Sequence, residues 1–212
     1  GNNFVDEALS KGASIVLVDN KRFLKTRKKN IIYVKNTITA LKKISENIIK
    51  KYKGNVIAIT GSNGKTSTTN ILANSLSNTS KTKGNFNNEI GMPLSLINAS
   101  SKSKNIVLEI GASKIGDINY LSKILKPIVG VITNIGNSHL ETLKNINGVL
   151  TVKSEIVHNI KKNGYLIVPN ENKNHLSHWR LIRKDINIYT FGMTKSSDFF
   201  ASDIRYKKDG MH

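Results

Sequence analysis

The fold is decided by the stretch Val56-Ile57-Ala58-Ile59-Thr60-Gly61-Ser62-Asn63-Gly64-Lys65-Thr66-Ser67. An apolar run typical of a buried strand leads into a glycine turn, then Gly-Lys-Thr, and then a helix-forming segment. This is the layout of a phosphate-binding loop, in which backbone N–H groups and a helix N-terminus face the same anion. Here it has the short form Gly-x-x-Gly-Lys-Thr, with Ile59 where the commoner form has glycine. The alternative is an ordinary strand–turn–helix.

The loop predicts a nucleotide site in which Lys65 reaches the terminal phosphates and the Thr66 hydroxyl ligates magnesium. A second polar segment, Asn85 to Pro93, contains Gly and Pro at its end. It is either a surface loop or a segment whose Asn side chains hydrogen-bond to phosphate or to substrate amides. The residues expected to bind the nucleotide are therefore Gly61, Ser62, Asn63, Gly64, Lys65, Thr66, Ser67, Asn87 and Asn88.

Composition limits the class of protein. The chain has 212 residues, 38% of them hydrophobic, and no apolar run of about 18 residues, so we expect no membrane span. Without cysteine there are no disulfides or thiolate metal sites. The opening residues 1–7 lack the pattern of a secretory signal, and we expect a cytoplasmic protein.

The formal net charge of +19 comes from 33 Lys and Arg against 14 Asp and Glu. One interpretation is a polyanionic partner such as nucleic acid. The other is compositional drift in a chain rich in Lys, Asn and Ile. The basic residues are scattered rather than gathered with aromatic residues, which favours the second interpretation and predicts no specific nucleic-acid partner.

The first part of the chain predicts a small α/β unit that ends near Lys53-Gly54-Asn55. A helix is expected over residues 4–9, strands over 14–18 and 31–34, and a long amphipathic helix over 37–52.

The second part alternates strands with helices, which predicts a parallel sheet with crossover helices. Ligands bind such sheets at the carboxyl ends of the strands, where the loop after Thr60, Glu109 and Asn134 fall. The expected strands are 57–60, 105–110, 128–133, 165–168 and 186–191, and the expected helices are 65–76, 117–125 and 147–160.

Three residues outside the loop are candidates for chemistry. Glu109 is costly in its apolar strand unless it is paired or binds a metal, so it is a predicted magnesium ligand; the alternative is a strand-end residue turned to solvent. His139 follows a strand at the binding edge of the sheet. Lys153, on a predicted helix, reads from its surroundings as one more solvated lysine.

Several ordered motifs together carry a family resemblance. They are residues 59–67, 85–93, Leu108 to Ser113 with Gly116-Asp117-Ile118, Thr133 to Gly136 with His139-Leu140-Glu141, and Lys153-Ser154-Glu155-Ile156. On these motifs the chain resembles the Mur ligases, the ATP-dependent amide-forming enzymes of peptidoglycan synthesis. The resemblance runs over nearly all of the chain and is closest to the type that adds D-alanyl-D-alanine.

The resemblance implies a reaction. ATP phosphorylates the C-terminal carboxylate of UDP-N-acetylmuramoyl-tripeptide, and the amine of D-alanyl-D-alanine then displaces phosphate from the acyl phosphate. It implies two magnesium ions, one held by Thr66 and Glu109 and the other contacted by His139. It implies that Lys153 is carbamylated, which turns a cation into an anionic metal ligand. Asn134 is expected to shape the phosphate and metal pocket, so the implied catalytic set is Lys65, Lys153, His139 and Asn134.

The resemblance also implies a domain organisation within the α/β class. Residues 1–53 match part of the N-terminal substrate domain, and residues 54–212 match an incomplete P-loop-type central ATPase domain. A third domain is not covered, so residues 1–212 alone are expected to be inactive. The protein is also expected to be a monomer. The alternatives are a sibling amide ligase, such as a folate-glutamate type, and a basic nucleotide-dependent nucleic-acid-binding protein.

Overall fold

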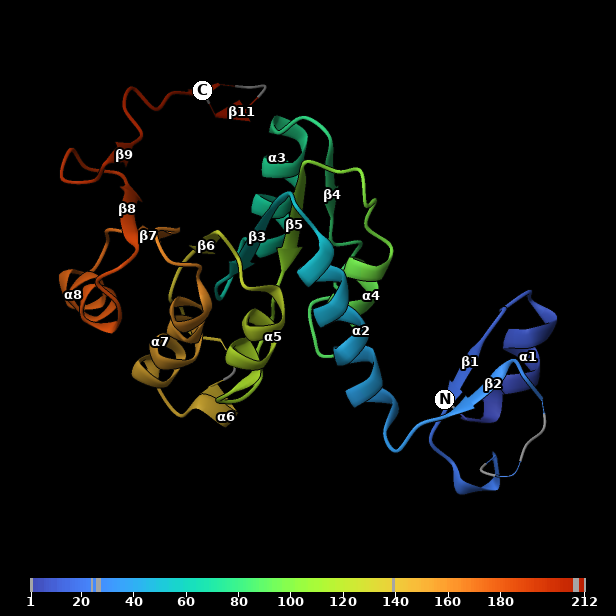
Figure 1. The fold of residues 1–212 in the computed structure, drawn as a ribbon. Helices are drawn as coiled ribbons and strands as arrows, with labels where there is room; N and C mark the ends of the chain where they lie inside the picture. Colours follow the sequence, from blue (N-terminus) through green and yellow to red (C-terminus); the bar gives the residue numbers. More distant parts are fainter. Residues whose placement is uncertain (1, 24, 26–27, 139, 208–209, 212) are drawn as a thin grey trace.

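A seven-stranded parallel sheet forms the centre of the molecule, with strand order β4-β5-β3-β6-β7-β8-β9. The structure is a computed structural model that describes residues 2–23, 25, 28–138, 140–207 and 210–211. Figure 1 shows the sheet with helices on both faces, and a smaller unit beside it at the N-terminal end. The α/β class and the parallel sheet predicted from the sequence are confirmed.

The first strand of the large sheet along the chain, β3, lies inside the sheet, paired in parallel with β5 on one side and β6 on the other. Their bounds are β3 (Asn55–Thr60), β4 (Thr79–Lys81), β5 (Asn105–Glu109), β6 (Val129–Ile132), β7 (Tyr165–Pro169), β8 (Asn187–Gly192) and β9 (Phe199–Phe200). A short antiparallel pair follows, β10 (Tyr206–Lys207) and β11 (Gly210–Met211).

Both faces of β3 are buried, which explains why its sequence is apolar without alternation. Val56 and Ala58 face one hydrophobic cluster, while Ile57 and Ile59 face the other. The larger cluster contains residues of α4 (Gly91–Ile97), α5 (Asp117–Leu125), α7 (Ile146–Ser154), the 3-10 helix η3 (Glu155–Asn159) and α8 (Lys173–Ile182). The opposite face is covered by α3 (Lys65–Ser75), and a short α6 (Leu140–Leu143) precedes α7.

The N-terminal unit has a hydrophobic cluster of its own, made of Val5, Val18 and Ile31. It consists of η1 (Asn2–Phe4), α1 (Val5–Ser10), β1 (Val16–Val18), η2 (Lys21–Phe23) and β2 (Ile31–Tyr33), with β1 and β2 paired in parallel. From it the chain enters α2 (Thr37–Lys51), which packs through Ile48 and Ile49 on the core of the large sheet. The domain boundary placed after residue 53 stays a prediction.

The N-terminal unit is fastened to the start of α2 by Asp19. Its carboxylate accepts hydrogen bonds from Asn2 Nδ2 (2.7 Å), from the Thr37 backbone N–H (3.0 Å) and from Thr37 Oγ1 (2.8 Å). These bonds lower the pKa of Asp19 to about 2, the Asn2 bond being the largest cause. Asp19 therefore ties the small unit to the helix that reaches the large one.

The structure corrects several sequence predictions. The helix expected over 147–160 ends at Ser154 and continues as a 3-10 helix. The segment expected to stop at Gly91 and Pro93 instead starts α4 there, because the first turn of a helix has no partner for the N–H that proline lacks. Helix α8 and the short strands β4 and β9 were not predicted. Among the described residues no helix is both long and apolar enough to cross a membrane.

Candidate active site

The phosphate-binding loop lies between the end of β3 at Thr60 and the start of α3 at Lys65. Both of its glycines have positive φ, +146° at Gly61 and +77° at Gly64, a region that side chains rarely adopt. At Gly61 a Cβ would lie 1.9 Å from Thr133 Oγ1, so no other residue fits. Lys65 Nζ donates to the carbonyls of Gly61 (2.9 Å) and Ser62 (3.2 Å), which keeps the ammonium over the loop.

The chain after β6 holds the loop in place. Asn134 Oδ1 accepts from the Asn63 backbone N–H (2.9 Å), and Thr133 Oγ1 donates to the Asn63 carbonyl (2.6 Å). Ser62 Oγ donates to the Gly136 carbonyl (2.9 Å) and accepts from the Gly136 N–H (3.0 Å). Asn134 thus supports the loop from its neighbouring strand end.

Glu109, at the end of β5, is only 2% exposed. Its carboxylate accepts from Thr66 Oγ1 (2.7 Å) and from Asn87 Nδ2 (2.7 Å), so the alternative of a residue turned to solvent is wrong. The structure therefore brings together one residue of the phosphate loop, one strand end and one asparagine of the 85–93 segment. Their oxygens are of the kind that magnesium prefers.

Lys153, on the last turn of α7, is only 1% exposed, so the expectation of a solvated lysine is wrong. Burial is the main cause that lowers the pKa of its amine to about 8, and the nearby charge of Lys65 lowers it further, while Asp117 and Glu155 oppose the shift. The Glu155 carboxylate is hydrogen-bonded to the N–H groups of Gly116 (2.7 Å) and Asn119 (2.9 Å), at the start of α5. No hydrogen bond or ion pair to the Lys153 amine occurs within the described part of the chain.

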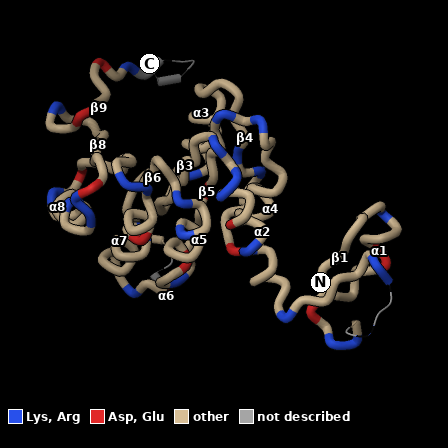
Figure 2. Tube along the Cα trace, viewed as in Figure 1, with Lys and Arg blue, Asp and Glu red and all other residues tan. Residues whose placement is uncertain are grey.

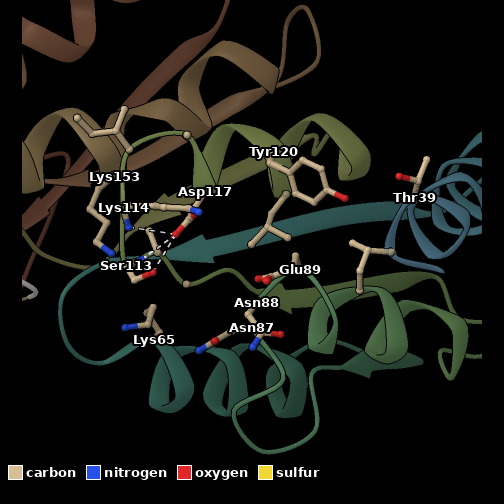
Figure 3. A pocket seen from close by; sticks show the side chains of 16 residues that line it. Thr39, Lys65, Asn87, Asn88, Glu89, Ser113, Lys114, Asp117, Tyr120 and Lys153 are labelled. Carbon is tan, nitrogen blue, oxygen red and sulfur yellow. Dashed lines mark hydrogen bonds between the residues drawn. The ribbon is translucent and has the colours of Figure 1, made fainter. Parts of the chain in front are cut away.

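A cavity of about 890 Å³ is lined by Lys65 of the phosphate loop, by Asn87 and by Lys153. Lys65 and Lys153 both line it, with the segment between β5 and α5 forming one wall (Figure 3). Its lining residues are Ile38, Thr39, Lys65, Asn87, Asn88, Glu89, Gly111, Ala112, Ser113, Lys114, Ile115, Gly116, Asp117, Tyr120, Leu121 and Lys153.

Sequence reasoning missed several residues of this cavity. Thr39 and Tyr120 come from helices that were predicted without any functional residue. Glu89 lies in the segment 85–93, in which only Asn87 and Asn88 were predicted to bind a ligand. Asn88, predicted to bind nucleotide, uses its side-chain oxygen to accept from the N–H groups of Ile90 (3.1 Å) and Gly91 (2.8 Å) at the start of α4. His139, the predicted contact of a second magnesium, lies outside the described residues. Across the described ranges no group of three or more His, Cys, Asp or Glu is placed to hold a metal.

Lys and Arg occur along the trace of both the small unit and the large sheet (Figure 2). They are not confined to the elements around the cavity. The scattered pattern read from the sequence is therefore retained in the fold.

Comparison with known proteins gives a consistent family. The model of the Mur ligase middle domain matches residues 59–212. The UDP-N-acetylmuramoyl-tripeptide–D-alanyl-D-alanine ligase of Buchnera aphidicola subsp. Baizongia pistaciae is 42% identical over 98% of this chain and 45% of the relative. That of Bacillus subtilis is 33% identical over 100% of this chain and 46% of the relative. The chain thus spans about half the length of the curated relatives it matches.

A solved structure supports the same assignment. The crystal structure of MurF ligase from Thermotoga maritima in complex with ADP has a TM-score of 0.86 at 30% identity. The alignment covers 99% of this chain and 48% of that chain. The family resemblance stated from the motifs is confirmed by these matches.

Proposed function

The chain belongs to the Mur ligase family, and we propose that the protein joins D-alanyl-D-alanine to UDP-N-acetylmuramoyl-tripeptide at the expense of ATP. The observation that carries the proposal is that the phosphate-loop lysine, Lys65, and the buried Lys153 line one cavity with room for more than a phosphate group. Relatives named as this ligase align with nearly the whole chain. Residues 1–53 would belong to the domain for the uridine nucleotide substrate and residues 54–212 to the ATP-binding domain.

The phosphate loop would hold the nucleotide and the carboxylate substrate close together. The N–H groups of residues 61–67 and the N-terminus of α3 face the phosphates, and Lys65 neutralises the terminal ones. A carboxylate oxygen of the tripeptide would attack the γ-phosphorus of ATP, the bond from that phosphorus to the β-phosphate oxygen would break, and ADP would leave an acyl phosphate behind. The unprotonated amine of D-alanyl-D-alanine would attack the carbonyl carbon of the acyl phosphate and form the new C–N bond. The nitrogen would lose a proton to solvent, and phosphate would leave with the P–O–C oxygen.

Magnesium fits the pair Thr66 and Glu109, because a hydroxyl and a carboxylate meet beside the loop and phosphate oxygens can complete the shell. Held there, the ion would offset negative charge on the γ-phosphate and on the substrate carboxylate. Asn87 Nδ2 donates to the other carboxylate oxygen of Glu109 and so fixes the orientation of the Glu109 carboxylate. The contact of His139 with a second ion stays a prediction.

Lys153 is suited to carbamylation, because the reaction needs an unprotonated amine and burial lowers the pKa of this one to about 8. Attack of the amine on carbon dioxide forms an N–C bond and releases a proton. The product is a carbamate, so an anionic oxygen ligand takes the place of the lysine cation. Asp117 and Glu155, the carboxylates whose charges act on the amine, have side-chain hydrogen bonds to backbone N–H groups. A cytoplasmic, monomeric enzyme stays a prediction.

The test is phosphate release by the full-length gene product with UDP-muramyl-tripeptide, D-alanyl-D-alanine, ATP and magnesium. Release that needs both substrates and is lost in Lys65→Ala supports the proposal. Release only with another acid–amine pair, such as a folate and glutamate, would keep the phosphate-loop chemistry and overturn the substrate assignment. Salt-dependent binding of DNA or RNA without release would favour the nucleic-acid alternative.

A further inference from the structure

Glu155 is the second charged residue of the motif Lys153-Ser154-Glu155-Ile156. It is the first residue of η3, directly after α7, and its side chain is buried. Its two carboxylate oxygens bind different N–H groups: Oε1 accepts from Gly116 (2.7 Å) and Oε2 from Asn119 (2.9 Å). Within the described ranges it forms no ion pair with Lys153. The carboxylate is therefore directed at the start of α5.

The two N–H groups that Glu155 binds are the two that a capping box satisfies. In a capping box the N-cap side chain accepts from the N–H three residues later, and a side chain at that later position reaches back to the N-cap N–H. Here the N-cap is Gly116, which has no side chain and a φ of +94°. The Asn119 side chain instead accepts from Asn159 Nδ2 (2.9 Å). One carboxylate from the end of α7 thus replaces both side chains of the box, and its negative charge suits the helix N-terminus.

The start of α5 is continuous with a wall of the cavity. This wall is the segment 111–117, which follows β5, and β5 pairs with β3, whose end carries the phosphate loop. The Asp117 carboxylate accepts from the N–H groups of Ser113 (2.9 Å) and Lys114 (3.1 Å), as the dashed lines of Figure 3 mark. The wall and the first turn of α5 therefore form one hydrogen-bonded unit, and Glu155 fastens that unit to the end of α7.

Lys153 depends on this fastening for its position. Its amine has no hydrogen bond or ion pair in the part of the chain that the structure describes, so the backbone that carries it sets where it lies. That backbone is held by Ser154 Oγ, which accepts from Trp179 Nε1 (2.8 Å), and by Glu155. The first contact ties it to α8, and the second ties it to the wall of the cavity that Lys153 also lines.

We propose that Glu155 is a positioning residue of the ligase: by capping α5 from the end of α7, it sets the place of the Lys153 side chain relative to Lys65 and the phosphate loop. This inference rests on the proposed function. A group needed at the reacting centre loses its effect on rate when it is displaced. ATP is held by the phosphate loop, which Glu155 does not contact. Loss of the Glu155 contacts should therefore lower kcat and leave KM for ATP unchanged.

The experiment compares two variants of the full-length gene product with wild type. Glu155→Asp keeps the negative charge near Lys153 but is one methylene shorter, so it cannot reach both N–H groups. Glu155→Gln keeps the length but has only one side-chain oxygen as acceptor. The matched control is Asn159→Ala. Asn159 also joins η3 to α5, by donating to Asn119 Oδ1 and Ser122 Oγ (2.9 Å each), but it leaves the N–H groups at the start of α5 untouched.

Two quantities are measured. The first is kcat and KM for ATP from phosphate release with both substrates, expressed per ATP site counted by calorimetric titration, so that unfolded protein does not enter kcat. The second is the rate at which acetic anhydride acetylates Lys153, followed by mass spectrometry, which reports on the burial of this side chain and needs no ligase activity.

Both Glu155 variants should lower kcat about tenfold at unchanged KM for ATP. In both, Lys153 should be acetylated about tenfold faster than in wild type, because the wall separates from α7 more often. Asn159→Ala should match wild type in both measurements. A wild-type kcat in Glu155→Asp would show that only the charge acts on Lys153, and would overturn the inference. Equal losses of kcat in Asn159→Ala and the Glu155 variants would also overturn it, since any loosening of α5 would then suffice.

The two proposals fail in different ways. A wild type that releases no phosphate with the tripeptide and D-alanyl-D-alanine would overturn the proposed function. The acetylation rates then decide the role of Glu155 alone: a wild-type rate at Lys153 in both Glu155 variants would overturn it, whatever the activity.

Discussion

Replacement of Ser154 by alanine should destabilise the protein by breaking a buried contact next to Lys153. Trp179 Nε1 donates to Ser154 Oγ (2.8 Å), and Ser154 Oγ donates to the Leu150 carbonyl (2.6 Å). Trp179 is fully buried and Ser154 is 2% exposed. Without the hydroxyl the indole N–H is left without an acceptor, which costs about 2 kcal/mol of unfolding free energy. For a chain of this size that is a fall in Tm of about 4–8 °C.

The assay is urea unfolding followed by fluorescence, which is specific because Trp179 is the only tryptophan of the chain. The matched control is Ser75→Ala, since Ser75 Oγ also donates to the carbonyl four residues earlier (2.9 Å) but is exposed and accepts nothing from tryptophan. The control should stay within about 0.5 kcal/mol of wild type. An unfolding free energy of Ser154→Ala equal to that of the control would refute the reasoning.

Three further predictions concern charged groups. In Glu109→Gln the affinity for ATP in the presence of magnesium should fall at least about tenfold, while the affinity for ATP in EDTA should not change, as measured by calorimetric titration of the full-length gene product. Equal losses of affinity with magnesium and with EDTA would contradict a metal role for Glu109. Because burial depresses the pKa of Lys153, the unfolded state binds more protons than the folded state between about pH 8 and 10.5, and the unfolding free energy should rise with pH across that window. In Lys153→Met this rise should be absent, and the unfolding free energy at pH 7 should be higher than that of wild type by roughly 1–3 kcal/mol. A rise that persists in the variant would show that another group causes it. Because the pKa of Asp19 is lowered in the folded state, its carboxylate stabilises the fold at pH values above its ordinary pKa of 3.8, and this stabilisation is lost as the pH falls toward about 2. Asp19→Asn should therefore make the unfolding free energy, followed by circular dichroism, depend less on pH in that range. A pH dependence equal to that of wild type would count against the Asn2 and Thr37 contacts as the source of the stabilisation.

The geometry of the phosphate loop could be predicted from the local sequence alone. Its glycines, its lysine and the strand before it are adjacent in sequence, so residues 56–67 predict the geometry found. The central strands were also predictable, because strands buried on both faces are apolar throughout. Helix α4 was missed because its Gly91 and Pro93 are read as breakers until the Asn88 cap and the packing of Phe86 are known. Helix α7 was predicted to be longer than it is.

The sequence by itself determined the parallel α/β sheet, the phosphate loop at the end of β3, and the family to which the chain belongs. Only the tertiary structure decided which residues come together: that Glu109 bonds to Thr66, that Lys153 is buried, and that Glu155 caps the start of α5. The reason is physical. Strand and helix patterns depend on residues within one or two turns of each other, whereas burial and the charge of a cavity depend on segments that only the packed fold brings together.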